Sequence, residues 1–419
     1  MGKGLNTPTD RPPVHPSRPA PSRNLSVDFI RGCALLGILW NHVAGLSPGS
    51  AFHLRALNPS YWVLFDWADV FVFLSGLVFG LVHIRAVRGG GLWASYAGAL
   101  TRAWELYAAN ILTFVAVLVA FGALYEPGLV DGYPHQSARM DAFAADPTAA
   151  ALDVVTLQPL LDFFDILILY LGLLCIAPAL LWGVEKNAGY GLAASGGLWV
   201  FAQAGLEWGP PAFNLFAWQF LFCLGMVAGV WNRPLPRRPL LFWSSLALAA
   251  LGALAMPLVI LQGRGFGPDV DWAGWVGMLT GKSSLRAGRV LSFAAAAYLV
   301  ARLVSRAGEV WNSSFLRPIV IAGQNSLGVF CFGIVITYVA VFVVHRVSAN
   351  PASVLAVIIM ACLTSVAFAY AMEWRKRLSV IYRSSRAEQT VSLLNGEETS
   401  TRSSEHTASP RPTRATPNH

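Results

Sequence analysis

The sequence predicts an all-α protein, a polytopic transmembrane helical bundle of about ten helices with both chain ends in the cytoplasm. Of its 419 residues, 55% are hydrophobic and only 12% are charged, and the mean hydropathy is +0.53. A soluble protein of this length needs a more polar surface, so the composition indicates a membrane protein. Each crossing requires about 20 largely apolar residues, because a membrane helix must satisfy its backbone hydrogen bonds internally.

Apolar runs of that length define the predicted helices. A run near 190–206 is short and Gly-rich, and one near 319–345 is long enough to tilt or to break near Gly333. Nine or eleven spans therefore also fit the pattern. In chain order, the predicted spans are 28–46, 62–84, 99–121, 160–182, 190–206, 214–231, 240–261, 289–305, 319–345 and 352–373.

Basic residues set the predicted orientation, because positively charged loops stay in the cytoplasm. With both ends inside, most of the 30 Lys and Arg residues fall on the cytoplasmic side of a bacterial inner membrane. The net charge of +8 then reflects topology and not nucleic-acid binding. Residues 1–24 and 379–419 are polar and are predicted to be disordered cytoplasmic tails around one membrane domain at 25–378.

The five cysteines lie in apolar runs without paired spacing. This distribution predicts neither a disulfide framework nor a metal site. We also expect no bound cofactor.

Ionisable side chains inside spans are the first candidates for function, because burying one is costly unless it is paired or reaches water. Arg31 and His42 are eleven residues apart, which puts them on one helix face about 16 Å apart along the axis. An arginine at the inner end suits the phosphates of a cytoplasmic donor, and a deeper histidine suits a general base. The alternatives are an Arg31 that reaches lipid headgroups or pairs with Asp28, and a His42 that bonds a neighbouring helix.

The second span begins with Asp66 and Asp69. We expect Asp69 at the depth of His42, where a carboxylate would orient the imidazole and stabilise its cation. A carboxylate favoured by the positive end of the helix dipole is the alternative. Further along, Gly76 and Gly80 form a small-residue face that predicts close packing against another helix.

Seven motifs follow one another along the chain: Asp28-Phe29-Ile30-Arg31-Gly32, Asn41-His42, Asp69-Val70-Phe71-Val72-Phe73-Leu74-Ser75-Gly76, Asp165-Ile166-Leu167-Ile168-Leu169-Tyr170, Phe213-Asn214-Leu215-Phe216-Ala217-Trp218-Gln219, Gly281-Lys282 with Arg289, and Gly323-Gln324-Asn325-Ser326-Leu327-Gly328-Val329-Phe330. In this order they resemble the OpgC family, membrane proteins linked to succinylation of osmoregulated periplasmic glucans. The family is similar to a branch of the type-three membrane acyltransferase superfamily, whose first helix carries a basic residue, ten intervening residues and a histidine, as Arg31 and His42 do.

The resemblance implies a membrane-bound O-acyltransferase with a catalytic His42. It implies transfer of a succinyl group from cytoplasmic succinyl-CoA, an acyl-CoA co-substrate, to hydroxyls of a periplasmic glucan. The expected partners are the lipid bilayer, the acyl-CoA and the polysaccharide. The chain departs from the family pattern at 283–289 and at Ala295, where an aromatic residue or histidine is expected, which bears on the identity of the substrate.

Two further groups are candidates for binding at the two ends of the bundle. On the outer side, Lys282 and Arg289 suit the free carboxylate of a succinyl group, or are structural. Gln324 and Asn325 lie at the inner end of the bundle, at the same depth as Arg31. We expect them to line a channel for the donor, and hydrogen bonds to neighbouring helices are the alternative.

A third candidate group lies at the outer end of the sixth span. Asn214, Trp218 and Gln219 combine aromatic and amide groups that suit sugar hydroxyls. An interfacial aromatic belt is the alternative.

The predicted mechanism joins these groups along the first span. Arg31 holds the phosphates of acyl-CoA, the pantetheine arm passes between spans one, two and nine, and His42, oriented by Asp69, deprotonates the acceptor hydroxyl. A covalent acyl intermediate on His42 is the alternative. The rival from another class is a transporter or flippase of a glycan or lipid-linked precursor, which would show paired broken helices in two halves. An acyltransferase acting on another surface polysaccharide differs only in its acceptor.

Overall fold

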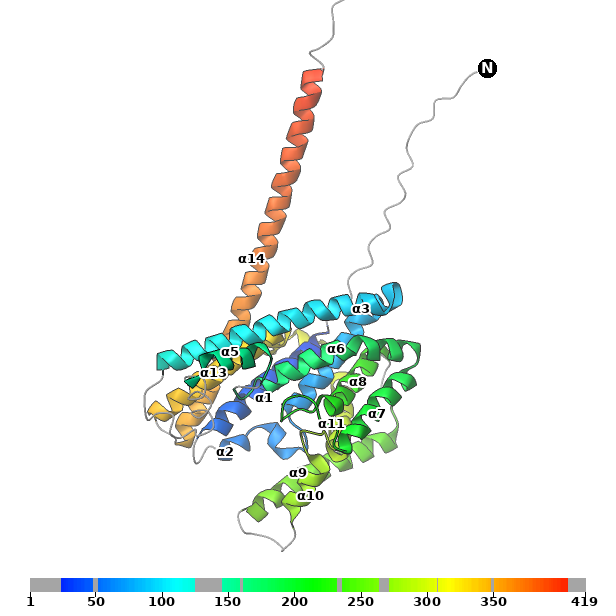
Figure 1. Ribbon diagram of the computed structural model, residues 1–419, viewed down its shortest axis with the longest axis vertical. Helices are drawn as coiled ribbons and strands as arrows, with labels where there is room; N and C mark the ends of the chain where they lie inside the picture. Colours follow the sequence, from blue (N-terminus) through cyan, green and yellow to red (C-terminus); the bar gives the residue numbers. More distant parts are fainter. Residues whose placement is uncertain are drawn as a thin grey trace, which may run out of the picture.

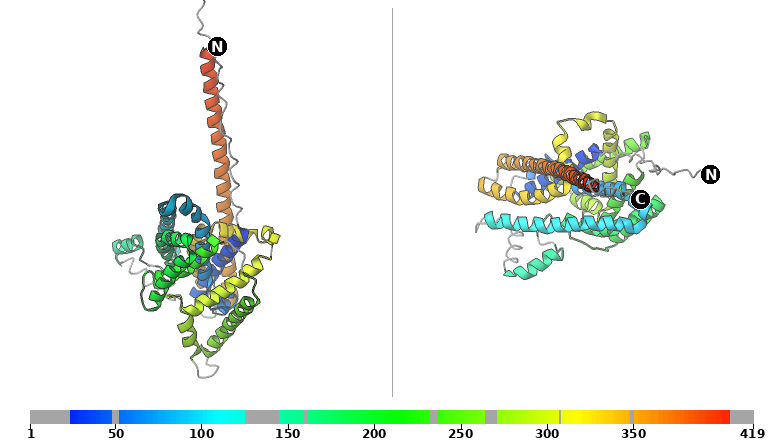
Figure 2. Two further views of the ribbon diagram at one scale, coloured as in Figure 1. Left: turned by 90° about the vertical axis from the view of Figure 1, so that its right-hand side faces the viewer. Right: turned by 90° about the horizontal axis from the view of Figure 1, so that it is seen from above.

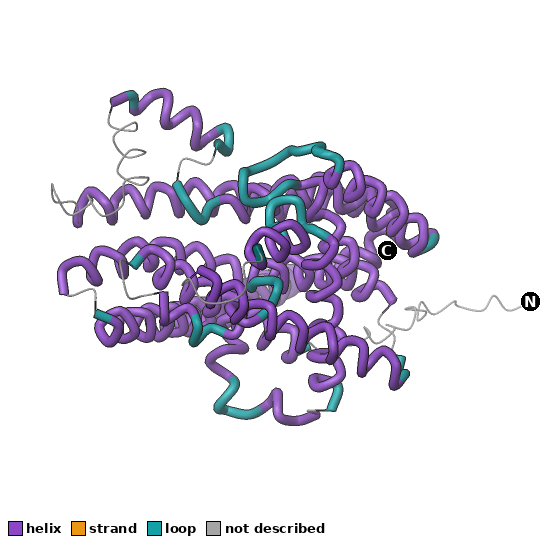
Figure 3. Tube along the Cα trace, turned by 90° about the horizontal axis from the view of Figure 1, so that it is seen from below, coloured by secondary structure: helices purple, strands orange, loops and turns teal. Residues whose placement is uncertain are grey.

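The computed structural model describes residues 24–47, 52–124, 145–158, 161–231, 236–263, 271–306, 308–347 and 350–405, and within them it contains helices and loops but no strand (Figure 3). The all-helical class predicted from the sequence is confirmed for this part of the chain (Figure 1). The helices are α1 (Leu25–Leu46), α2 (Phe52–Arg55), η2 (Pro59–Trp62), α3 (Trp67–Leu124), α5 (Pro147–Val155), α6 (Asp165–Lys186), α7 (Ala188–Gln203), α8 (Leu215–Trp231), α9 (Pro239–Gly263), α10 (Trp272–Thr280), α11 (Ala287–Val304), η3 (Gly308–Asn312), α12 (Arg317–Gln324), α13 (Ser326–Val347) and α14 (Pro351–Glu405).

Seven of the described helices are long and apolar enough to cross a membrane, so the protein is a multi-pass membrane protein. Each of the ten predicted spans overlaps a helix, although α7 and α8 are shorter than the seven. Two predicted spans fall within α3, which turns at Gly91, where φ is +71°. Glycine adopts this left-handed conformation without steric cost, so Gly91 separates α3 into two arms that run in different directions (Figure 1).

The predicted span 319–345, which was expected to tilt or to break near Gly333, is interrupted at another residue. Gly333 lies inside the continuous helix α13, and the interruption falls at Asn325, between α12 and α13. There the Asn325 side chain donates to the Ile321 carbonyl, four residues earlier, at 2.9 Å. Such a local side-chain bond to the backbone competes with regular helix geometry, which explains an interruption at a polar residue.

Helix α14 differs from the sequence prediction in length. It continues through the predicted disordered tail as far as Glu405 and projects away from the rest of the bundle (Figures 1 and 2). Residues 1–23 and 406–419 of the predicted tails lie outside the described part of the chain.

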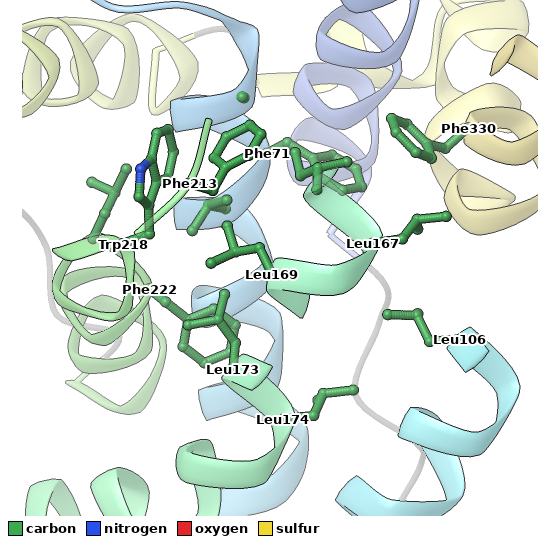
Figure 4. Packing of buried hydrophobic residues seen from close by; sticks show 14 of the residues in the cluster. Phe71, Leu106, Leu167, Leu169, Leu173, Leu174, Phe213, Trp218, Phe222 and Phe330 are labelled. Atoms are coloured by element: carbon green, nitrogen blue, oxygen red, sulfur yellow. The ribbon is translucent and has the colours of Figure 1, made fainter. Parts of the chain in front are cut away.

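Helices α3 and α8 pack closely on one another through small residues. A Cβ at Gly76 or Gly80 would overlap the backbone of Phe222 or Met226 in α8, and Gly225 and Gly229 of α8 meet the backbone of α3 in the same way. The predicted close-packing face of Gly76 and Gly80 is therefore confirmed. Helix α6 packs on this pair, and Leu169, Leu173 and Phe222 fill the core beside it (Figure 4).

Helix α1 lies between this core and the pair α13 and α14. Its start packs against α12 so closely that a Cβ at Gly32 or Gly323 would overlap the backbone of the facing helix. Helices α9, α10 and α11 pack mainly on one another at one edge of the bundle, where most of the apolar side chains of α9 are exposed (Figure 1). The central position of α1 brings it into contact with α3 and α12, which carry the predicted site residues Asp69 and Gln324.

Candidate active site

His42 lines a cavity of about 560 Å³ near the C-terminal end of α1. Its imidazole stacks on Phe163, with ring centroids 3.8 Å apart. Within the described residues, no hydrogen bond reaches its ring nitrogens, so they are available to a substrate. The lining is rich in polar side chains, which include Asn41, Arg55, Ser60, Asp66, Asp162, Asp165 and Lys282.

One wall of this cavity is the segment between α1 and α3, which the hydropathy pattern did not resolve. Asn58 is buried there and donates to the Gly37 carbonyl of α1 at 3.0 Å, while it accepts from Trp67 Nε1 at 2.7 Å. Asn41, next to His42, donates to Ser60 Oγ at 2.9 Å. These bonds fasten the segment to the C-terminal half of α1.

A network of four charged side chains lies beside the cavity. Arg289 donates to both carboxylate oxygens of Asp69, at 2.9 Å and 2.5 Å, in a bidentate pair that is almost entirely buried. Asp66 contacts both cations, with its Oδ2 2.9 Å from Lys282 Nζ and 3.0 Å from Arg289 Nη2. Two acids and two bases balance one another, which is what allows Asp69 and Arg289 to be buried.

The geometry of Asp69 differs from the predicted role beside His42. Besides the Arg289 pair, Asp69 accepts the backbone N–H of Asp66 at 2.8 Å, and none of its bonds reaches His42. Asp69 therefore holds Arg289 and Asp66 in place. Asp66 lines the cavity with His42, as do Asp162 and Asp165.

The loop that carries Lys282 is held by hydrogen bonds from α7 and α8. Trp218 Nε1 donates to the carbonyls of Lys282 and Ser283, each at 3.1 Å. Trp199 and Gln203 of α7 donate to the next two carbonyls along the loop, at 2.9 Å and 2.6 Å. The loop backbone is thus fixed at successive positions, which sets where Lys282 enters the cavity.

The three residues predicted to bind sugar hydroxyls are engaged inside the protein. Asn214 donates to the Leu206 carbonyl at 2.7 Å and accepts the N–H of Phe216. Gln219 is fully buried, where it accepts from Ser195 Oγ and donates to the Ser195 carbonyl. Together with Trp218, these side chains support the loop and do not line the cavity.

The predicted donor residues meet at the other end of α1. Arg31 Nη2 donates to Ser326 Oγ at 2.5 Å, at the start of α13. Gln324 donates to Asp28 at 3.3 Å, and Lys376 of α14 donates to Asn325 Oδ1 at 2.6 Å. We name Asp28, Arg31, Gln324, Asn325, Ser326 and Lys376 the inner cluster.

The inner cluster bears on the predicted topology. Arg31 lies near the start of α1, and Lys376 lies near the end of Pro351–Val380, the apolar part of α14. Both meet at the break between α12 and α13, so the two ends of the membrane domain lie at the same end of the bundle. This agrees with an even number of spans, while the compartment that this end faces stays a prediction.

A narrow apolar crevice lies next to His42 on the side of the inner cluster. It has a volume of about 10 Å³ and is lined by Leu35 and Leu39 of α1, Gly333 and Ile334 of α13, Ser365 of α14, and His42 itself. A space of this size holds about one water molecule, so a pantetheine arm enters only if the helices separate.

Sequence reasoning missed three polar residues that the fold brings to these sites. Asp66 was noted at the start of its span but not included in the site. Arg55 lies in a four-residue helix outside every predicted span, and Lys376 follows the last predicted span. Within the described residues, no cluster of three or more His, Cys, Asp or Glu side chains is arranged to hold a metal ion.

Comparison with known proteins gives one family match. The family model described as "OpgC protein" matches residues 23–377, which is most of the chain and includes both the cavity and the inner cluster. Comparison with curated proteins and with solved structures gives no match.

Proposed function

This chain belongs to the OpgC protein family and is therefore a membrane acyltransferase, and we propose that it transfers a succinyl group from succinyl-CoA to hydroxyls of a periplasmic glucan in the bacterial inner membrane. The observation that carries this proposal is the position of His42, which lines both the polar cavity at one end of α1 and the crevice that leads toward the inner cluster. One side chain can thus meet an acceptor from one compartment and a donor from the other.

The donor binds at the inner cluster. Arg31 and Lys376 supply positive charge for the phosphates of acyl-CoA, and Gln324, Asn325 and Ser326 supply polar contacts at the helix break. The pantetheine arm extends along the crevice between α1, α13 and α14, which places its route at α14 and not at the second predicted span. The distance from Arg31 to His42, about 16 Å along the helix axis, is the length that this arm has to cover.

The chemical step takes place in the cavity. His42 accepts the proton of a sugar hydroxyl, the oxygen attacks the thioester carbonyl, and the carbon–sulfur bond breaks. The CoA thiolate then takes the proton from the imidazolium, so an ester and free CoA leave. Asp66 lines the same cavity, and its negative charge stabilises the imidazolium while the proton resides there.

The acceptor binds in the wide cavity. Its lining of amide, hydroxyl and charged side chains, with Tyr61, Trp67 and Phe213 beside them, matches the hydroxyls and apolar ring faces of a sugar. Lys282 and Arg289 form ion pairs with Asp66 and Asp69, so we propose that these two cations maintain the shape of the cavity.

Mass spectrometry of periplasmic glucans tests the proposal. Cells that lack the protein should lose the succinyl mass increments, and expression of the wild-type protein should restore them. If the glucans of wild-type cells carry no succinyl groups and another surface polysaccharide carries them, that polysaccharide is the acceptor. Increments that persist on the glucans of cells lacking the protein would refute it.

A further inference from the structure

Arg55 is a cation of the cavity that the sequence did not single out. It ends the short helix α2, and its guanidinium lies against α1 at Gly45, where an added Cβ would be 2.5 Å from Nη2 and 3.4 Å from Cζ. Gly45 follows His42 by three residues, so the two positions neighbour one another on α1, about 4.5 Å apart along the axis. The guanidinium therefore lies beside α1 within one helical turn of position 42, and both side chains line the same cavity.

The charges of the cavity leave Arg55 without a partner. Lys282 is paired with Asp66, and Arg289 with Asp69. Among the described residues, no ion pair and no side-chain hydrogen bond involves the Arg55 guanidinium. The remaining carboxylates of the lining, Asp162 and Asp165, make interactions of their own.

A half-buried guanidinium without an anion is an unfavourable arrangement that a bound carboxylate would relieve. We infer that Arg55 binds the free carboxylate of a short dicarboxylic acyl group while the reacting carbonyl of that group lies at His42. The inference rests on the proposed function, because it requires an acyl donor in this cavity. It adds to that function the residue that recognises the carboxylate of the acyl group.

The geometry favours this ligand over a neutral acyl chain. The planar guanidinium offers two parallel N–H donors to a carboxylate, and the turn of helix between Gly45 and His42 is short enough for a dicarboxylic chain to span. Lys282 and Arg289 are poorer candidates, because binding the acyl carboxylate would require them to leave Asp66 or Asp69. We therefore assign recognition of the acyl carboxylate to Arg55 instead of Lys282 and Arg289.

The test compares two donors with one uncharged acceptor. The purified full-length protein is supplied with succinyl-CoA or acetyl-CoA and a neutral glucan, and kcat/KM is measured from the ester product. Arg55→Gln should lower kcat/KM for succinyl transfer about 10- to 100-fold while acetyl transfer stays within about twofold, because one charge-assisted contact is lost. Arg55→Lys should retain part of the preference, and Arg237→Gln, at an exposed arginine, should leave it unchanged.

A second variant gives the same information if Arg55→Gln does not fold. Gly45→Ala keeps the charge but puts a methyl group 2.5 Å from Nη2, which forces the guanidinium to move, so it should also lower succinyl transfer more than acetyl transfer. A wild-type selectivity that both variants leave intact, or an equal loss with both donors, would overturn the Arg55 assignment alone. Failure of the wild-type protein to transfer either group would overturn the proposed function as well.

Discussion

Replacing Asp69 with asparagine removes one charge from the most deeply buried ion pair that the structure describes. Asp69 is 0% exposed and Arg289 is 7% exposed, and two hydrogen bonds of 2.9 Å and 2.5 Å join them. Removing one partner of such a pair costs about 3–5 kcal/mol, because the other charge stays buried without compensation. Asp66 remains 3.0 Å from Arg289, so we expect Asp69→Asn to cost about 3 kcal/mol, at the lower end of that range.

The free energy of unfolding in detergent micelles measures this cost. A double-mutant cycle with Arg289→Gln should show that the second substitution recovers much of the loss, because it removes the uncompensated charge. Glu105→Gln is the control, since the exposed pair of Glu105 with Arg102 should contribute less than about 1 kcal/mol. If Asp69→Asn costs no more than Glu105→Gln, the buried network does not hold the site together.

Three further predictions concern the donor route and the loop. Gly333→Leu should fill the crevice and raise KM for acyl-CoA at least tenfold in steady-state kinetics. Gly333→Ala is the control and should leave the protein stable and active, because its Cβ meets no atom within 4 Å. Equal KM values in the two variants would exclude this route. Arg31→Gln should raise KM for the donor about tenfold with little change in kcat at saturation, because it removes a charge-assisted contact with phosphate, and an unchanged KM would contradict donor binding there. Trp218→Phe removes the hydrogen-bond donor to the carbonyls of Lys282 and Ser283, so it should lower the free energy of unfolding by about 1 kcal/mol and with it the melting temperature. A melting temperature equal to that of the wild type would contradict the role of Trp218 in holding the loop.

Hydropathy predicted the helices well, because a membrane helix must be apolar along its whole length. It could not predict how helices turn or break. Gly91 needs a positive φ that only the fold reveals, and Asn325 interrupts a helix through its own bond to the Ile321 carbonyl. Gly333 looked like the weaker point but keeps helical geometry inside α13.

The site was predictable only where its residues share one helix. The period of α1 placed Arg31 and His42 on one face, and the structure puts one in the inner cluster and the other in the cavity. The partner of Asp69 is Arg289, 220 residues away, and no local pattern pairs them. Arg55 lies in a four-residue helix outside every apolar run, so neither its place nor its lack of a partner could be inferred from hydropathy.

Transfer across a sealed membrane tests the central claim most directly, since one side chain is proposed to serve both compartments. Proteoliposomes would hold the protein with succinyl-CoA on the side of the inner cluster and a glucan on the opposite side, and the succinyl ester would be quantified by mass spectrometry. We predict ester formation by the wild-type protein and by His83→Ala, a histidine of α3 that stacks on Phe79 away from the cavity, and none by His42→Ala in correctly folded form. Ester formation by His42→Ala at the wild-type rate would contradict the account.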